Sequence, residues 1–423
     1  MARTLSAATG PTVTRPGRGQ MAVLLAAVFT VMLGYGVTLT VLPYYTSRVH
    51  RLNGISDSAL AVHIGILTGV YALAQLVSGP LIGRLTDRRG RRPVAVAGLV
   101  GVGVTQIAFG TVSSLWWLYA LRVAGGVAAS LLTVAAMAMI ADWTDERSRP
   151  RGMALFGTAV SLGIVAGPVL GGLLNGVTID VGGISLDGYS LPFVAAGSMA
   201  LAAAALLEWR LATSPPHVTS SAHPADGQTR RDRIAPSLAL VVAAQFGLAL
   251  FESTFVLYAR DRFAFTVGQT TQAFLVCGGV MAVLQLVAAG PLQRVLPPRV
   301  QIAVGFLAMG AGIGALLAVQ TLGSVLTAVG VLAAGTALIT PNLAAVVTLT
   351  SPKTVGASLG MRSSASSFGQ FLGPVVGGTL LAWRAASPYA LAALVLGGAA
   401  VAAALAARTT GRAPQHRATD SRQ

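Results

Sequence analysis

Two ionisable side chains lie deep inside long apolar stretches. Glu252 stands in LALFESTF, and Arg122 stands in LRVAGG. A charge in such surroundings is costly, so it normally faces a cavity or a partner. A carboxylate can exchange a proton and attract a cation, so Glu252 is either a coupling or substrate-binding acid or half of a structural ion pair. Arg122 keeps its charge, so it can tune a carboxylate or bind helix carbonyls but cannot shuttle protons.

A second charged group is the segment GRLTDRRGRRP at residues 83–93, which holds one acid among five arginines. A positive helix N-terminus or an arginine can bind the Asp87 carboxylate. Arg91 and Arg92 are the candidate arginine partners. Gly83 would allow two helices to approach closely. We expect a gate here, and the alternative is that the arginines only anchor the chain. The predicted gating residues are Gly83, Asp87, Arg88, Gly90, Arg91 and Arg92.

A third pattern is a stripe of glycines in GIVAGPVLGG at residues 163–172. Glycines at this spacing form a flat helix face that can pack tightly, and we expect it to meet the other half of the protein. Pro168 removes a backbone donor and favours a kink. The alternative is ordinary packing of small residues without directional meaning. The residues of this motif are Gly163, Gly167, Pro168, Gly171 and Gly172.

Several polar or aromatic side chains lie within the apolar stretches. They either line a cavity or form hydrogen bonds between packed helices. Asp142 is different, because it stands at the end of an apolar run and is expected to be a solvated helix end. The candidate cavity-lining residues are Tyr35, Gln75, Gln106, Gln245, Gln285 and Asn342.

The elements that must position these groups are membrane-spanning helices. Of the 423 residues, 54% are hydrophobic and only 10% are charged. Continuous apolar runs of about 20 residues predict spanning helices and exclude a barrel of alternating strands. The sequence predicts twelve spans, at 21–42, 60–82, 93–112, 115–141, 152–174, 190–209, 236–259, 268–292, 300–320, 323–349, 355–382 and 386–407.

The basic residues that give the chain its net charge of +16 are distributed as the expected membrane topology requires. Most of the 29 basic residues lie in the two termini or at alternate junctions between spans. The positive-inside rule then places both termini in the cytoplasm. We expect a protein of the plasma membrane, most readily a bacterial one, whose first span is not cleaved. Basic junctions also favour anionic lipids, and this placement argues against nucleic acid as a partner.

The chain divides into two similar halves. Residues 211–235 are rich in Pro, Ser and polar residues and predict a cytoplasmic linker. GIVAGPVLGG at 163–172 recurs as GQFLGPVVGG at 369–378, which indicates a duplicated six-helix unit. The expected parts are an N-terminal arm at 1–20, bundles at 21–210 and 236–407, and a tail at 408–423.

Other chemistry finds no support in the sequence. Cys277 is the only cysteine, so no disulfide within the chain and no cysteine metal site is expected. The only lysine, Lys353, is not part of a phosphate-binding loop, so the energy source must be a gradient. We expect neither cofactor nor metal, no enzymatic activity, and a monomer.

Four motifs resemble the major facilitator superfamily and its drug/proton antiporter branch with twelve spans. They are GPLIGRLTDRRGRRP at 79–93, LRVAGG at 121–126, GPVLGG at 167–172 and VLP at 41–43. The resemblance implies two pseudo-symmetric six-helix bundles, with the segment after the second span acting as a latch between them. ESTF at 252–255 resembles the helix-7 acid region of Gram-positive multidrug exporters.

The N-terminal half also resembles the tetracycline exporters, in HIGILTGVYALAQ at 63–75 and IADWTDERSR at 140–149. Those exporters have an acid in the first span, where this chain has none near Val31, and its ninth span also lacks one. This departure argues against tetracycline as the substrate.

Together, these features predict a secondary active transporter that exports small amphiphilic or cationic compounds in exchange for protons by alternating access. One alternative is an exporter of a single native metabolite such as a sugar, an amino acid or an antibiotic. An importer or symporter of the same fold is a further alternative, and a membrane receptor that transports nothing is another.

Overall fold

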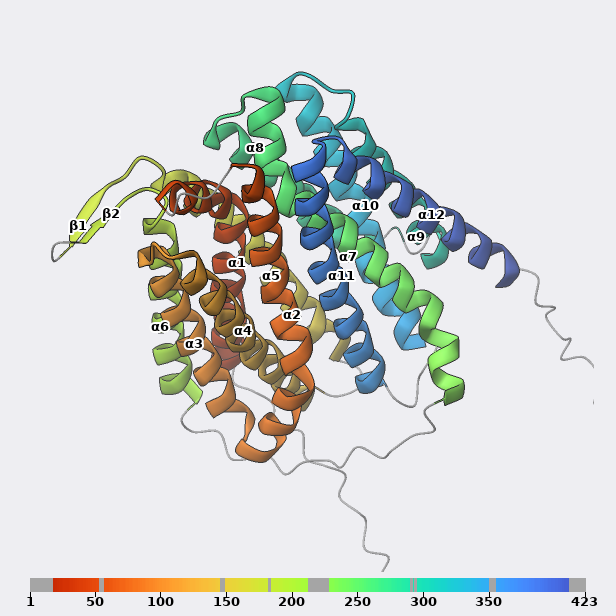
Figure 1. The fold of residues 1–423 in the computed structure, drawn as a ribbon. Coiled ribbons are helices and arrows are strands. Elements are labelled where there is room, and N and C mark those ends of the chain that lie inside the picture. Colours follow the sequence, from red (N-terminus) through yellow and green to blue (C-terminus); the bar gives the residue numbers. More distant parts are fainter. Residues whose placement is uncertain are drawn as a thin grey trace, which may run out of the picture. The chain divides into compact units, whose positions relative to one another are not determined.

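The computed structural model describes residues 18–52, 57–144, 149–181, 184–211, 228–289, 292, 295–349 and 355–410. Within these residues the chain forms helices and one pair of short strands (Figure 1). The helices are α1 (Arg18–Leu52), α2 (Asp57–Arg89), α3 (Arg91–Thr111), α4 (Leu115–Trp143), α5 (Arg149–Leu174), α6 (Leu191–Leu211), α7 (Gln228–Phe263), α8 (Val267–Ala289), α9 (Pro298–Ala315), α10 (Leu322–Leu349), α11 (Val355–Trp383) and α12 (Ser387–Thr410).

Eleven of the described helices are long and apolar enough to cross a membrane. The twelfth, α11, falls short because it carries the polar stretch MRSSASSFGQ at 361–370. A helix that is apolar over this length is favoured in lipid because it satisfies its own backbone hydrogen bonds. The predicted all-α membrane class is therefore confirmed.

The chain forms two compact units. Unit 1 comprises Met1–Val41 and Ala74–Ser221, and unit 2 comprises Leu42–Leu73 and Ala222–Gln423. In unit 1, α3 packs against α4 and α6; in unit 2, α7 packs against α11, and α9 against α10 and α12. The boundaries predicted from sequence differ in detail, since the end of α1 and the first part of α2 group with unit 2.

The predicted linker at 211–235 is only partly within the described residues. Residues 212–227 lie outside them, whereas α7 already begins at Gln228 and contains Pro236. Most of the N-terminal arm and of the C-terminal tail also lies outside the described residues.

The glycine stripe of α5 packs against α1 inside unit 1. A Cβ atom at Gly163 would stand 2.6 Å from the Phe29 carbonyl oxygen, and one at Gly171 would stand 2.9 Å from Val41 Cγ2. Between them, Gly167 lies against the backbone of Gly36. These approaches are closer than a side chain permits, so α1 and α5 meet through their backbones. The contacts that these glycines make are thus with α1 of the same unit, and the expected contact with the other half of the protein stays a prediction.

The remaining residues of the motif fit this packing. Pro168 is buried, and α5 continues through it to Leu174. Gly172 is half-buried. Since a proline removes one backbone donor, α5 keeps its course here through packing rather than through a complete hydrogen-bond ladder.

The same arrangement recurs between α11 and α7 in unit 2. A Cβ atom at Gly369 would stand 2.6 Å from the Val242 carbonyl oxygen, and one at Gly373 would stand 2.8 Å from the Leu250 nitrogen. A Cβ atom at Gly377 would stand 2.9 Å from Thr254 Cγ2. The repeated motif therefore makes equivalent backbone contacts in both units, which supports the duplication inferred from the sequence.

The first part of α2 joins unit 2 through a further set of close contacts with α11. A Cβ atom at Gly378 would stand 3.0 Å from the Gly65 Cα atom. One at Gly69 would stand 2.7 Å from Val375 Cγ2. These contacts explain why residues 42–73 group with the C-terminal helices.

A short hairpin between α5 and α6 was not predicted. Strand β1 (Ile179–Val181) pairs antiparallel with β2 (Ile184–Leu186), with Asp180 opposite Ser185. After β2, Asp187 accepts a hydrogen bond from the Ser190 backbone nitrogen at 2.9 Å and so caps the start of α6. The apolar runs on either side gave no signal for this small sheet.

The α1–α5 contact leads to a first prediction. Replacing Gly167→Ala should lower the apparent melting temperature of the protein in detergent, because the new methyl group overpacks the contact at a cost of about 1–3 kcal/mol. Gly157→Ala on the same helix is the matched control, since a Cβ atom there meets nothing within 4 Å. The control should be neutral or stabilise by about 0.5–1 kcal/mol. Equal melting temperatures for the two variants would contradict this packing.

Candidate functional site

Glu252 lies far from both ends of α7 and is half-buried. One face of α7 packs on α11 through Phe246 and Leu250. Another face meets α8, where the rings of Phe251 and Phe274 lie 6.1 Å apart. The Glu252 carboxylate is close enough to the Cys277 thiol of α8 to interact with it electrostatically. The acid therefore lies on α7 within electrostatic reach of α8.

An amide pair lies on the same side of α7. Gln370 of α11 donates from Nε2 to Gln245 Oε1 at 3.2 Å. Gln245 precedes Glu252 by seven residues, which is about two helical turns and places both on one face. Sequence reasoning selected Gln245 but missed Gln370, although the polar stretch of α11 was a visible signal. This face of unit 2 offers both an acid and hydrogen-bonding amides.

Asn342 does not line a cavity. Its side chain is fully buried and donates from Nδ2 to Gln301 Oε1 at 2.9 Å and to the Leu338 carbonyl oxygen at 2.8 Å. Gln301 also donates to the Leu296 carbonyl oxygen at 2.8 Å. Asn342 therefore forms hydrogen bonds between packed helices, which is the second of the two interpretations that the sequence allowed.

The other candidate lining residues are divided between the units. A Cβ atom at Gly34 would stand 2.5 Å from the Gln106 amide nitrogen, so Gln106 covers the α1 backbone. Tyr35 and Gln75 are half-buried in unit 1, and Gln285 is half-buried in unit 2. Their lining role stays a prediction.

Arg122 is buried in unit 1, with 4% of its surface exposed. It lies on α4, on the same side as buried Gly125, Ala129 and Leu118. A guanidinium keeps its charge in such surroundings, so it sets a fixed positive potential inside unit 1. Its assignment to proton coupling or substrate binding stays a prediction.

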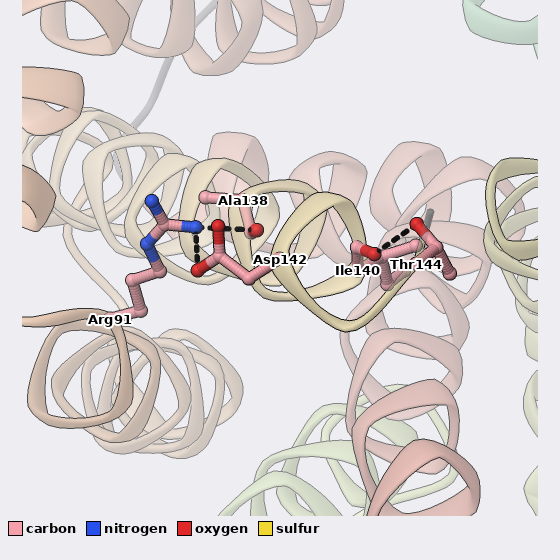
Figure 2. A network of polar contacts seen from close by, with 5 residues as sticks. All are labelled: Arg91, Ala138, Ile140, Asp142 and Thr144. Atoms are coloured by element: carbon pink, nitrogen blue, oxygen red, sulfur yellow. Dashed lines mark hydrogen bonds and ion pairs between the residues drawn. The ribbon is translucent and has the colours of Figure 1, made fainter. Parts of the chain in front are cut away.

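The charged segment at 83–93 ties helices together at one end of unit 1. Gly90, at φ +85°, makes the turn from α2 to α3, a conformation that glycine adopts without strain. Arg91 then forms an ion pair with Asp142 of α4 and donates from Nη1 to the Ala138 carbonyl oxygen at 2.6 Å (Figure 2). Thr144 donates to the Ile140 carbonyl oxygen at 2.6 Å in the same last turn.

Asp142 is therefore a partner of Arg91 and not the solvated helix end expected from the sequence. Its side chain and that of Arg91 are each 23% exposed. The two residues are far apart in the sequence, so spacing alone gave no sign of the pair. The sequence did show an acid at the end of one span and arginines at the start of another, and this combination could have suggested the pair.

Arg92 makes a second tie, to the end of α6. Its guanidinium pairs with the Glu208 carboxylate and donates to the Glu208 carbonyl oxygen at 2.9 Å. The Glu208 side chain is 55% exposed, so solvent screens this pair more than the Arg91 pair. Two residues later, the Arg210 guanidinium stacks 4.6 Å from the ring of the exposed Trp209. The α2–α3 turn is thus fixed to both α4 and α6.

The other residues of the segment do not make the expected contacts within unit 1. Asp87 and Arg88 are exposed, and Asp87 has no ion pair with any described residue. Arg91 and Arg92, its expected partners, bind other acids. A Cβ atom at Gly83 would meet no described atom within 4 Å, so no close helix approach occurs there in this structure. The role of Gly83 and Asp87 in a latch stays a prediction.

The Arg91–Asp142 pair can be measured by a double-mutant cycle. The variants Arg91→Ala, Asp142→Ala and the double variant should show a coupling free energy of about 1 kcal/mol in denaturant unfolding in detergent. The matched cycle on Arg92 and Glu208 should give about 0.5 kcal/mol or less, because its acid is more exposed. Additive effects at Arg91 and Asp142 would show that this pair contributes nothing.

Comparison with known proteins supplies the family. A profile described as Major Facilitator Superfamily matches residues 24–333 and 239–423. Multidrug resistance protein 2 of Bacillus subtilis (strain 168) is 28% identical over 390 residues, which cover 88% of this chain and 92% of that protein. The class G tetracycline resistance protein of Vibrio anguillarum is 31% identical over 362 residues, covering 81% of this chain and 85% of that protein.

Solved structures share the fold. The human organic anion transporter MFSD10 matches with a TM-score of 0.69 at 20% identity, over 92% of this chain and 100% of that one. An occupied, inward-facing bacterial homologue of the human lysosomal transporter Spinster matches with a TM-score of 0.69 at 18% identity, over 93% of this chain and 98% of that one. The repeated glycine contacts, the spanning helices and these matches together place the chain in the Major Facilitator Superfamily of membrane transporters.

Proposed function

We propose that this transporter exports small amphiphilic or cationic compounds from the cytoplasm in exchange for protons, by alternating access. The observation that carries the proposal is the position of Glu252. Among the acids in the described helices, Glu252 alone lies far from a helix end. A carboxylate at that depth is costly when charged, so binding either a proton or a cation there is favourable.

Competition for one carboxylate produces exchange. A proton and a cationic substrate each neutralise Glu252, so binding one disfavours the other. If the protein releases the proton on one side of the membrane and the substrate on the other, each ligand drives the other. Phe251, Phe255 and Phe274 pack against one another in the interior of unit 2, so the surroundings of this acid are apolar.

The relatives favour the export of drugs over import and over the transport of other substrates. Two of them are named as multidrug resistance proteins and match along most of this chain. The first span has no acid, and Val31 is buried, so the tetracycline-binding arrangement expected of the other relatives is not supported here. With the basic junctions facing the cytoplasm, both termini would be cytoplasmic and the substrate would leave a bacterial cell through its plasma membrane.

A second candidate is an exporter of one native polar metabolite. The amide pair formed by Gln245 and Gln370 favours it, because paired amides recognise hydroxyl or amide groups specifically. A screen that finds transport of one sugar, amino acid or antibiotic, and no transport of unrelated cationic dyes, would favour this candidate.

The test of the main proposal is transport in inverted membrane vesicles. With an imposed proton gradient, the wild-type protein should accumulate the cationic dye ethidium, and Glu252→Gln should reduce accumulation to background because it cannot exchange a proton. Asp261→Asn is the matched control, since Asp261 is an exposed acid on the same helix. Asp261→Asn should transport normally.

A second measurement separates coupling from loss of fold. Adding ethidium to purified wild-type protein should release protons, and adding it to Glu252→Gln should release none while the melting temperature stays close to wild type. Wild-type rates of accumulation in Glu252→Gln vesicles would rule out this residue as the coupling acid.

A further inference from the structure

Arg362 is a charged side chain near a junction between spans. The positive-inside rule would explain it only as a residue that anchors the chain at the cytoplasmic surface. It lies within α11 and is half-buried. Its one hydrogen bond to a described residue runs from Nη2 to the Thr340 carbonyl oxygen of α10, at 3.5 Å. Its Nε atom is buried without a hydrogen-bond partner in the described part of the chain. An anchoring arginine would instead extend into solvent or lipid headgroups.

This guanidinium has unused binding capacity. An arginine presents five N–H donors in a fixed plane and stays charged. Leaving the buried Nε donor without an acceptor is costly, more so because the group is charged. Other arginines have acids, since Arg91 pairs with Asp142 and Arg260 with Asp261. No described acid pairs with Arg362.

The neighbouring residues on α11 can help to bind one. Ser366 lies one turn after Arg362 and is half-buried, so the two side chains project from the same face of the helix. Ser363 and Ser364 are exposed. Together with Arg362, these serines belong to the polar stretch that makes α11 less apolar than the other helices. A polar stretch in a membrane-spanning bundle normally borders a water-filled path.

The site is distinct from Glu252. Helices α7 and α11 run in the same direction, because Gly369 meets Val242 and Gly377 meets Thr254. The part of α7 that lies beside Arg362 is therefore about thirteen residues before Glu252. This corresponds to roughly 20 Å along the helix axis. A compact small molecule bound at one group would not reach the other, so Arg362 would act at a different stage of passage.

We propose that Arg362, with Ser366, forms a subsite for a single oxyanion such as a carboxylate, sulfonate or phosphate carried on an apolar body. A planar guanidinium fits two oxygens of such a group, and the serine hydroxyl supplies a further donor. The bond to Thr340 occupies only one of the donors. The inference goes beyond the proposed export function and depends neither on proton coupling nor on the direction of transport.

The test is a binding measurement on the purified full-length protein in phosphatidylcholine nanodiscs. Calorimetry compares naphthalene-2-sulfonate with 2-naphthylmethanol, which has a similar ring but no charge. The wild-type protein should bind the sulfonate about tenfold or more tightly than the alcohol, as expected for hydrogen bonds to a charged group. Arg362→Gln should weaken sulfonate binding roughly tenfold to a hundredfold and leave the alcohol unchanged.

Two further variants control the result. Arg384→Gln removes an exposed arginine just after the end of α11 and should bind both compounds as the wild type does. Arg362→Lys keeps the charge without the planar donors and should lose part of the sulfonate affinity. Equal wild-type affinities for the two compounds would overturn the proposal even if Arg362→Gln failed to fold. Undiminished sulfonate binding by folded Arg362→Gln would overturn it as well.

The source of the anion is resolved by the lipid. In nanodiscs that contain phosphatidylglycerol, unchanged sulfonate affinity would identify the subsite as one for small-molecule substrates. A loss of affinity there, with the alcohol unaffected, would identify a lipid phosphate as the occupant of the same oxyanion subsite.

Discussion

The close approach of backbones at glycine positions is the contact on which the arrangement of the other helices depends. Within a bilayer, association between helices gains little from burying apolar surface, so it depends on packing and on near contact of backbones. Gly163 and Gly167 bring α5 onto α1, and Gly369 and Gly373 bring α11 onto α7. These contacts also set the register of α7 against α11, and so the level of Glu252 within unit 2.

Sequence reasoning was most reliable where the signal is local. Apolar runs predicted the spanning helices, and GPxxGG predicted the repeat, because both are properties of consecutive residues. The contact of the glycine stripe with α1 was not predicted, because glycine has no side chain to mark what covers it. The ion pairs of Arg91 and Arg92 were missed for a different reason. Their acids, Asp142 and Glu208, lie 51 and 116 positions away along the chain, so only the packing of α3 against α4 and α6 reveals them.

The charges of this protein fall into two groups that differ in burial and therefore in use. At the ends of helices, solvent lowers the free-energy cost of a charge, so Arg92 and Glu208 can pair with little desolvation cost. Arg91 and Asp142 are less exposed and hold the α2–α3 turn to α4. Glu252 and Arg362 lie away from the helix ends and are half-buried, so water offsets their charge less, and the two proposals assign a ligand to each.

This division also constrains how selectivity arises in the proposed mechanism. Glu252 and Arg362 lie on α7 and α11, whose register is fixed by the glycine contacts at Gly369, Gly373 and Gly377. The two side chains therefore lie roughly 20 Å apart along the helix axis. In the proposed mechanism a compact substrate would meet them one after the other. An anionic group can then assist entry without competing with the proton at Glu252, so the two charges select on different properties of one molecule.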